Sequence, residues 1–142
     1  MLTPVECGKR CRVAFADHFK PRWGSYRLTG RKILFRDQPV FAAYSDFHAN
    51  ISQWFYGIPR DEWRDWPKQS LAILMKESYD VSYVLLDPKE STSLLAKCGQ
   101  DKNGEKKINI RMPTGGGRIY IVEWEDFPIH SRIARLPILW PS

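Results

Sequence analysis

Cysteine is scarce in this sequence, and long apolar runs are missing from it. The three cysteines, Cys7, Cys11 and Cys98, form an odd set that is too small for a disulfide framework. No stretch approaches the roughly 18 consecutive apolar residues of a membrane-spanning helix, and the N-terminus lacks the pattern of a signal peptide. We therefore expect a cytoplasmic protein, in a reducing compartment, with no membrane partner.

The spacing of metal-ligating residues is also incomplete. Cys7 and Cys11 lie one helical turn apart, and together with His18 they could ligate zinc. A second closely spaced pair of ligands is missing, however, and free cysteines are mostly small core residues. The sequence therefore predicts no metal site and no cofactor.

Internal repeats, low-complexity runs and long Pro/Gly/Ser linkers are absent, so nothing in the sequence indicates a second domain. A chain of 142 residues has the length of one core, and a hydrophobic fraction of 43% with a charged fraction of 27% is typical of a globular protein. We predict a single globular domain over residues 1–142.

Acidic residues are few in the first quarter of the chain. Residues 1–36 carry nine Lys/Arg against two acids, residues 37–101 carry six against ten, and residues 102–142 carry seven against four, for a net charge of +6. Two basic ends therefore flank a slightly acidic middle. If the ends meet in the fold, they form a positive surface suited to a polyanion. If they do not, the charge serves only solubility.

The order of the expected elements indicates an α+β fold. A capping box at residues 3–6 starts an N-terminal helix, which is expected to end before Pro21. Residues 25–41 alternate short apolar strands with tight turns at residues 29–31 and 37–39, a pattern that predicts a β-meander.

Further strands in a largely antiparallel sheet, with one or two short packing helices, complete the prediction. The stretch at residues 50–58 fits either a helix face or a strand, and we prefer the strand. Lys107, Asn109 and Arg111 alternate with apolar residues, which predicts a half-buried strand with a basic outer face. The other expected strands cover residues 71–75, 81–86 and 118–124, and the short helices cover residues 88–98 and 128–136.

Carboxylates near strand ends keep a metal-dependent nuclease as one alternative function. Asp80, Asp87 and Glu123 stand near expected strand ends, and Lys89 follows Asp87 by two residues. An acidic residue followed two places later by lysine at the end of a hairpin strand is missing downstream, and Asp87 is explained as a helix N-cap. Whether the protein is an enzyme therefore stays open, and no catalytic residue is assigned.

Histidines and a triple glycine are the remaining candidates for chemistry. Asp17 and His18 are adjacent in a helix and point in different directions, and Asp46 and His48 would share a face only in an extended segment. No nucleophile motif accompanies them. The glycines at residues 115–117 lack the Lys-Ser/Thr and the helix that follow a phosphate-binding loop, so we expect a flexible hairpin loop there.

Basic and aromatic residues are interleaved along the chain, and this pattern gives the leading functional expectation. Such residues supply cations for phosphates and rings on which bases stack. The expected nucleic-acid-binding residues are Arg22, Trp23, Arg27, Arg31, Lys32, Lys106, Lys107, Arg111 and Arg118. We therefore expect a non-catalytic nucleic-acid-binding domain with DNA or RNA as its partner.

The run at residues 59–68 favours a second alternative, a protein-interaction or assembly module. It combines Trp63 and Trp66 with acidic residues that would repel a phosphate backbone. It is polar and bounded by prolines, so we expect it to carry both tryptophans on the surface. These two side chains are the candidate protein-contact residues.

Overall fold

The computed structural model describes residues 2–36 and 38–141 and confirms an α+β fold with an N-terminal helix. The helices are α1 (Pro4–Trp23), α2 (Arg60–Trp63) and α3 (Pro88–Lys97), with a short 3₁₀ helix over His130–Arg132. The strands are β1 (Tyr26–Thr29), β2 (Lys32–Phe35), β3 (Pro39–Asp46), β4 (Gln53–Ile58), β5 (Ser70–Glu77), β6 (Asp80–Leu86), β7 (Lys106–Arg111), β8 (Tyr120–Ile121) and β9 (Ala134–Arg135).

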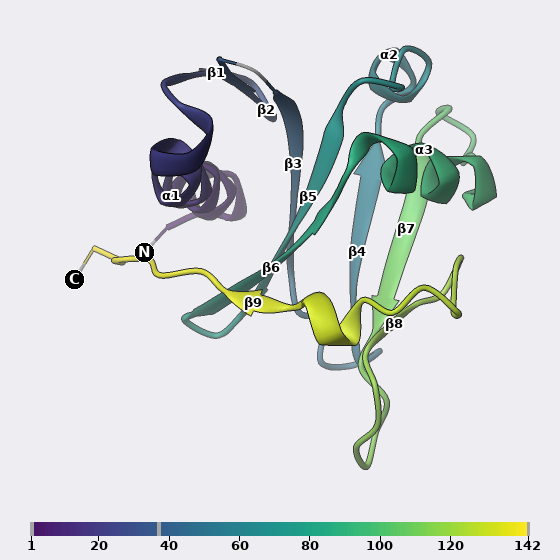
Figure 1. Cartoon of the computed structure of the whole chain (residues 1–142). Coiled ribbons are helices and arrows are strands. Elements are labelled where there is room, and N and C mark those ends of the chain that lie inside the picture. The colour runs from purple at the N-terminus through teal and green to yellow at the C-terminus, as the bar shows by residue number, and fades with distance from the viewer. Residues whose placement is uncertain (1, 37, 142) are drawn as a thin grey trace.

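Two sheets and one long helix form three layers (Figure 1). Sheet A has six strands in the order β1-β2-β3-β5-β6-β9, and sheet B has three in the order β4-β7-β8. Helix α1 packs on one face of sheet A, and sheet B with α3 packs on the opposite face. Every strand pair is antiparallel except β3 with β5, so the expectation of a largely antiparallel arrangement is confirmed.

The expected meander is present as β1, β2 and β3. These three strands pair in sequence order, and Gly30 at the first turn has a φ of 60°, a conformation that favours glycine. The second expected turn, at residues 37–39, includes Asp37, which lies outside the described residues.

Helix α1 begins at the expected capping box and ends later than expected. Thr3 and Glu6 each accept a hydrogen bond from the other's backbone amide. The helix continues through Pro21 to Trp23, so the predicted end before Pro21 is wrong. Proline lacks one amide donor in this last turn, but Trp23 stacks on Phe19 with ring centroids 4.4 Å apart and holds the turn helical. Although α1 spans 20 residues, no helix in the described part of the chain is both long and apolar enough to cross a membrane.

The two central strands of sheet A are buried on both faces. In β3, Val40 and Ala42 pack under α1, whereas Phe41 and Ala43 pack toward sheet B. Alternate residues of the neighbouring strand β5 likewise pack toward α1 and toward sheet B, and its residues 71–75 are all buried. Burial on both faces explains why this stretch is a continuous apolar run rather than an alternating one.

Sheet B confirms the alternation read from the sequence. The preferred strand at residues 50–58 is present as β4, which pairs with β7 in antiparallel register. Ile108 and Ile110 are fully buried. Lys107 and Asn109 are half-buried and Arg111 is exposed on the opposite side. We call this side, formed by Gln53, Phe55, Gly57, Lys107, Asn109 and Arg111, the outer face of sheet B.

The C-terminal quarter differs from the sequence prediction. The expected helix over residues 128–136 is only the 3₁₀ helix, followed by β9, whose Arg135 pairs with Ser82 of β6. The Leu136 amide also donates to the Val81 carbonyl at 2.9 Å. The free edge of β6 therefore takes up this segment as a sixth strand. The expected strand over residues 118–124 is reduced to the two residues of β8.

Candidate functional site

The two basic ends of the chain meet at Gly57 of β4. Arg31, in the turn between β1 and β2, donates from Nη1 to the Gly57 carbonyl at 3.4 Å. Lys107 lies opposite Gly57 in the β4–β7 ladder, and a Cβ on Gly57 would be 3.1 Å from its Nζ. The nearest atom to that Cβ is Glu105 Oε1, at 2.6 Å, so the missing side chain at Gly57 leaves room for the Lys107–Glu105 ion pair. Arg31 reaches the carbonyl of the same residue from a distant part of the sequence.

Arg12 of α1 extends this group of cations. Its Nε donates to the Ala42 carbonyl at 2.9 Å, and the Ala42 amide donates to the Arg31 carbonyl at 2.9 Å. A Cβ on Gly8 would lie 3.3 Å from Arg12 Nη1, so glycine leaves room for the guanidinium beside the helix. Burial lowers the pKa of Arg12, and the charge of Arg31 lowers it further. The guanidinium nevertheless stays protonated at neutral pH. We call Arg12, Arg31 and Lys107 the basic cluster.

The members of the basic cluster differ in whether a carboxylate lies close enough to balance their charge. Within residues 2–36 and 38–141, neither Arg12 nor Arg31 forms a salt bridge. Lys107 pairs with Glu105 at 2.8 Å and with Asp101 at 3.3 Å, and the hydrogen bond to Glu105 raises its pKa. A half-buried guanidinium beside a second cation is unfavourable until an anion binds. The two arginines are therefore suited to bind an external anion.

A chain of hydrogen bonds crosses the outer face of sheet B. Glu123 accepts from the backbone amide and from Nδ2 of Asn109, at 2.8 and 2.7 Å. Asn109 Oδ1 accepts from Gln53 Nε2 at 3.0 Å, and Gln53 Oε1 accepts from Arg111 Nη2 at 3.1 Å. Each bond fixes the orientation of the next amide, so the carboxylate at one end positions the exposed guanidinium at the other.

Phe55 lies in the middle of the same face. It is 42% exposed and faces Asn109 across the ladder. The His48 ring stacks on it with centroids 4.4 Å apart and an interplanar angle of 24°. Sequence reasoning missed Phe55, although a strand over residues 53–58 places it opposite to Trp54 and Tyr56 and hence on the outer side.

Three expected nucleic-acid-binding residues lie at or just beyond the C-terminal end of α1. Arg22 and Trp23 are about 15 Å along the helix from Arg12. Arg22 lies 5.7 Å from the centre of the Phe19 ring, and Trp23 is half-buried, with one face against that ring. Arg27 is exposed on the edge strand β1. The structure does not bring these residues into the basic cluster.

Arg118 is separate as well. It follows the glycines at residues 115–117, whose φ values of 80°, 96° and 120° favour glycine. Figure 1 shows the loop between β7 and β8 projecting beyond both sheets. Arg118 is exposed at the end of this loop.

Lys32 and Lys106 contact the segment around α2. Lys32 forms a salt bridge of 3.1 Å with Glu62. Lys106 donates to the Leu95 carbonyl at 2.6 Å, and its Nζ lies 4.7 Å from the centre of the Trp63 ring. Both ammonium groups are thus already satisfied within the protein, which reduces their availability to a phosphate.

The expected exposure of the two tryptophans is wrong for Trp66 and holds only in part for Trp63. Trp66 is 2% exposed, packs on Phe41 with ring centroids 5.6 Å apart, and donates its indole N–H to Ser91 at 2.7 Å. Trp63 is half-buried and donates to the Gly104 carbonyl at 2.9 Å. The segment folds back over the core because both indoles find apolar neighbours and an acceptor there.

The carboxylates considered for a nuclease lie in separate places. Asp80 forms a salt bridge with Arg135 at 2.6 Å, and Asp87 accepts from the Glu90 amide as the N-cap of α3. Glu123 is engaged with Asn109, as described above. Over the described ranges, no three His, Cys, Asp or Glu side chains are grouped so as to hold a metal ion.

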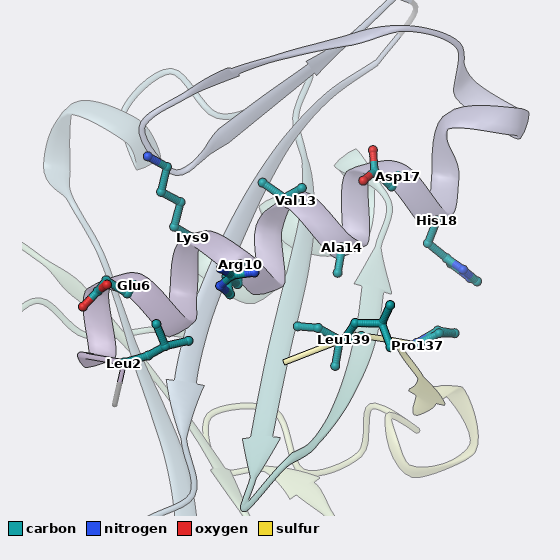
Figure 2. Close-up of a pocket in the computed structure, with 11 residues that line it drawn as sticks. Leu2, Glu6, Lys9, Arg10, Val13, Ala14, Asp17, His18, Pro137 and Leu139 are labelled. Carbon is teal, nitrogen blue, oxygen red and sulfur yellow. The ribbon is translucent and has the colours of Figure 1, made fainter. Parts of the chain in front are cut away.

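An open groove of about 800 Å³ lies between α1 and residues 137–139. Figure 2 shows that Asp17 and His18 point in different directions, and that Lys9 and Asp17 point away from Leu139. Asp17 instead accepts from the Tyr26 hydroxyl at 2.5 Å. The titratable groups of this groove therefore do not converge on a common point as an acid–base pair would.

The outer face of sheet B and the adjoining basic cluster are therefore the best candidate site in the described part of the chain. Here the structure brings together Arg31, Lys107 and Arg111 from the sequence prediction and adds Arg12 and Phe55. No known family model matches the chain, and no curated protein or solved structure matches it either.

Proposed function

We propose that this chain is a non-catalytic nucleic-acid-binding domain that contacts phosphates through the basic cluster. The supporting observation is that Arg12 and Arg31 lie near each other, Arg12 on the Ala42 carbonyl of β3 and Arg31 on the Gly57 carbonyl of β4, and that neither has a carboxylate partner among the described residues. Each guanidinium is held by one backbone carbonyl, so further N–H donors are left for phosphate oxygens.

The position of the cluster also supports a polyanion rather than a small anion. Arg111 lies on the same outer face as Lys107, four residues further along β7 and thus about 13 Å away. Cations spaced along a strand over this distance fit successive phosphates of a chain. The separate placement of Asp80, Asp87 and Glu123 supports binding without cleavage.

Fluorescence anisotropy with labelled single-stranded and double-stranded oligonucleotides, over a range of salt concentrations, tests this proposal. Arg31→Ala should weaken binding about equally for all sequences and should lower the slope of log K against log salt by about one unit. Lys107→Ala should have a smaller effect, because Glu105 and Asp101 already compensate its charge.

Lys89→Ala is the matched control, since it removes one exposed cation from α3, outside the basic cluster. It should leave the affinity within about twofold. Arg22→Ala and Arg27→Ala measure how far the interface extends toward the other end of α1. Absence of binding to any DNA or RNA at low salt would contradict the proposal.

A further inference from the structure

Phe55 is an unusual residue for its position in the sheet. Large apolar side chains on the outer side of β4 and β7 are otherwise absent, because its neighbours on that side are Gln53, Gly57, Asn109 and the cations Lys107 and Arg111. The carboxylates on this face are already engaged, Glu123 by Asn109 and Glu105 by Lys107. At 42% exposure, the ring leaves much of its apolar surface in water. An aromatic ring between two cations, on a face whose carboxylates are already engaged, fits a ligand that is both flat and anionic.

The ring of Phe55 is held in place before any ligand binds. His48 stacks on one face of it, and the backbone of His48 is fixed by paired hydrogen bonds with Gln53, at 2.9 and 3.3 Å. The Phe55 amide donates to Ser45 Oγ at 3.2 Å, which fixes the strand edge beside the ring. A ligand that stacks on the other face of the ring therefore loses little binding free energy to ordering the ring and its strand, because both are already held in place.

Cations lie on both sides of the ring along the direction of the strands. Asn109 of β7 lies directly opposite Phe55, and Lys107 and Arg111 lie two residues before and two residues after Asn109 on the same face. Arg111 is oriented by Gln53, which accepts from its Nη2 at 3.1 Å. A phosphate on one side of a stacked base would thus have Arg111 within reach, and a phosphate on the other side would have Lys107, whose charge Glu105 and Asp101 partly compensate.

From this arrangement we propose that Phe55 is the stacking platform for one unpaired base, so that the domain prefers single-stranded over double-stranded nucleic acid. The preference rests on the nucleic-acid binding proposed above. A duplex hides the faces of its bases within the stack, so it offers phosphates to the basic cluster but no face to Phe55. A single strand offers both.

The experiment compares Phe55→Ala with the native chain on an oligothymidylate of about 12 nucleotides and on a duplex containing it. Phe55→Ala should weaken single-strand binding roughly 5- to 150-fold, the range for loss of one stacked base, and should change duplex binding less than twofold. Phe55→Trp should restore or tighten single-strand binding. Tyr79→Ala, which removes an aromatic side chain that is 76% exposed in the β5–β6 turn, is the control.

The outcomes separate this inference from the function on which it rests. Phe55→Ala could leave single-strand binding unchanged, or weaken the binding of both ligands equally, while Arg31→Ala still weakens the binding of both. In either case the proposal that Phe55 is a stacking platform is wrong, and the proposal of nucleic-acid binding stands. If the native chain binds neither ligand at low salt, both proposals fail. Equal affinity of the native chain for the two ligands also overturns the preference for single strands.

Discussion

Trp66 donates its indole N–H to the hydroxyl of Ser91 at 2.7 Å, and this hydroxyl in turn donates to the Gln69 carbonyl at 3.0 Å. All three residues are buried. The contact joins the segment before β5 to the first turn of α3, so it closes the core between the two sheets at that end. A residue that the sequence placed on the surface is thus one of the main internal links of the fold.

Trp66→Ala should therefore destabilise the protein by about 3–5 kcal/mol, the range for removal of a large buried aromatic side chain. Trp66→Phe keeps a ring and loses only the N–H donor, so it should cost less, about 1–2 kcal/mol plus the packing difference. Urea denaturation followed by circular dichroism measures both values. Tyr79→Ala should stay within about 0.5 kcal/mol because its side chain is exposed. A loss for Trp66→Ala no larger than this control would contradict its burial.

Ile110→Asp should destabilise the protein by several kcal/mol, because Ile110 is fully buried and an aspartate there has no partner. Arg111→Gln, one residue further on the outer face, should cost less than about 1 kcal/mol. Denaturant titration of the two variants checks the register of β7. Equal effects would mean that the strand does not have one buried and one exposed side.

The contact between Glu90 and Arg132 predicts a dependence of stability on pH. Two hydrogen bonds of 2.8 and 2.5 Å join the carboxylate to the guanidinium, and they lower the pKa of Glu90. Because the folded-state pKa lies below the unfolded-state value of about 4.3, the stabilisation is present above that pH and is lost as the pH falls through the folded-state pKa.

Glu90→Gln should then cost about 1 kcal/mol at pH 7, since it keeps an acceptor for the N-cap of α3 but loses the charge. Thermal unfolding at pH 7 and at about pH 3 measures the difference between this variant and the native chain, which should shrink at the lower pH. A difference that grows on acidification would contradict the sign of the pKa shift.

Thiol reactivity should distinguish the three cysteines. Burial raises the pKa of Cys11 and of Cys98 to about 12, so neither forms the reactive thiolate at neutral pH. Cys7 is half-exposed. A thiol reagent such as dithionitrobenzoate should react with Cys7 alone in the native protein and with all three thiols in guanidinium chloride. In Cys7→Ser, no rapid reaction should remain, and a second fast thiol would show that α1 or α3 is less well packed than described.

Local signals predicted the helix starts and much of the sheet. The capping box at Thr3, the N-cap at Asp87, the alternation along β7 and the turn at Gly30 are each specified by neighbouring residues, so the sequence alone reveals them. The strand β9 is different, because nothing in residues 134–135 favours a strand until the free edge of β6 is available. The helical turn at Pro21 likewise depends on packing rather than on propensity.

The candidate site was only partly predictable for the same reason. Arg31 and Lys107 could be named as cations from composition, but their meeting depends on Gly57, which belongs to neither basic segment. Arg12 lies off the apolar stripe of α1, so its half-buried position beside Ala42 follows from the closeness of α1 to β3. The burial of Trp66 was unpredictable from a run of polar neighbours, since its acceptor Ser91 lies in another element.

The one parallel pair among the strands of the described residues, β3 with β5, has a consequence for how the chain folds. Partners in this ladder, such as Val40 and Ser70, are separated by the whole excursion through β4 and α2. Closing such a loop before its contacts form is slow, so refolding should take milliseconds to seconds, and stopped-flow tryptophan fluorescence would time it. Phe55 lies in β4, which belongs to the connection between β3 and β5, so this connection must fold back before the two strands of sheet A can pair. Changes that stiffen or loosen β4 should therefore alter the rate at which the central strands find each other, even where they leave the final stability unchanged.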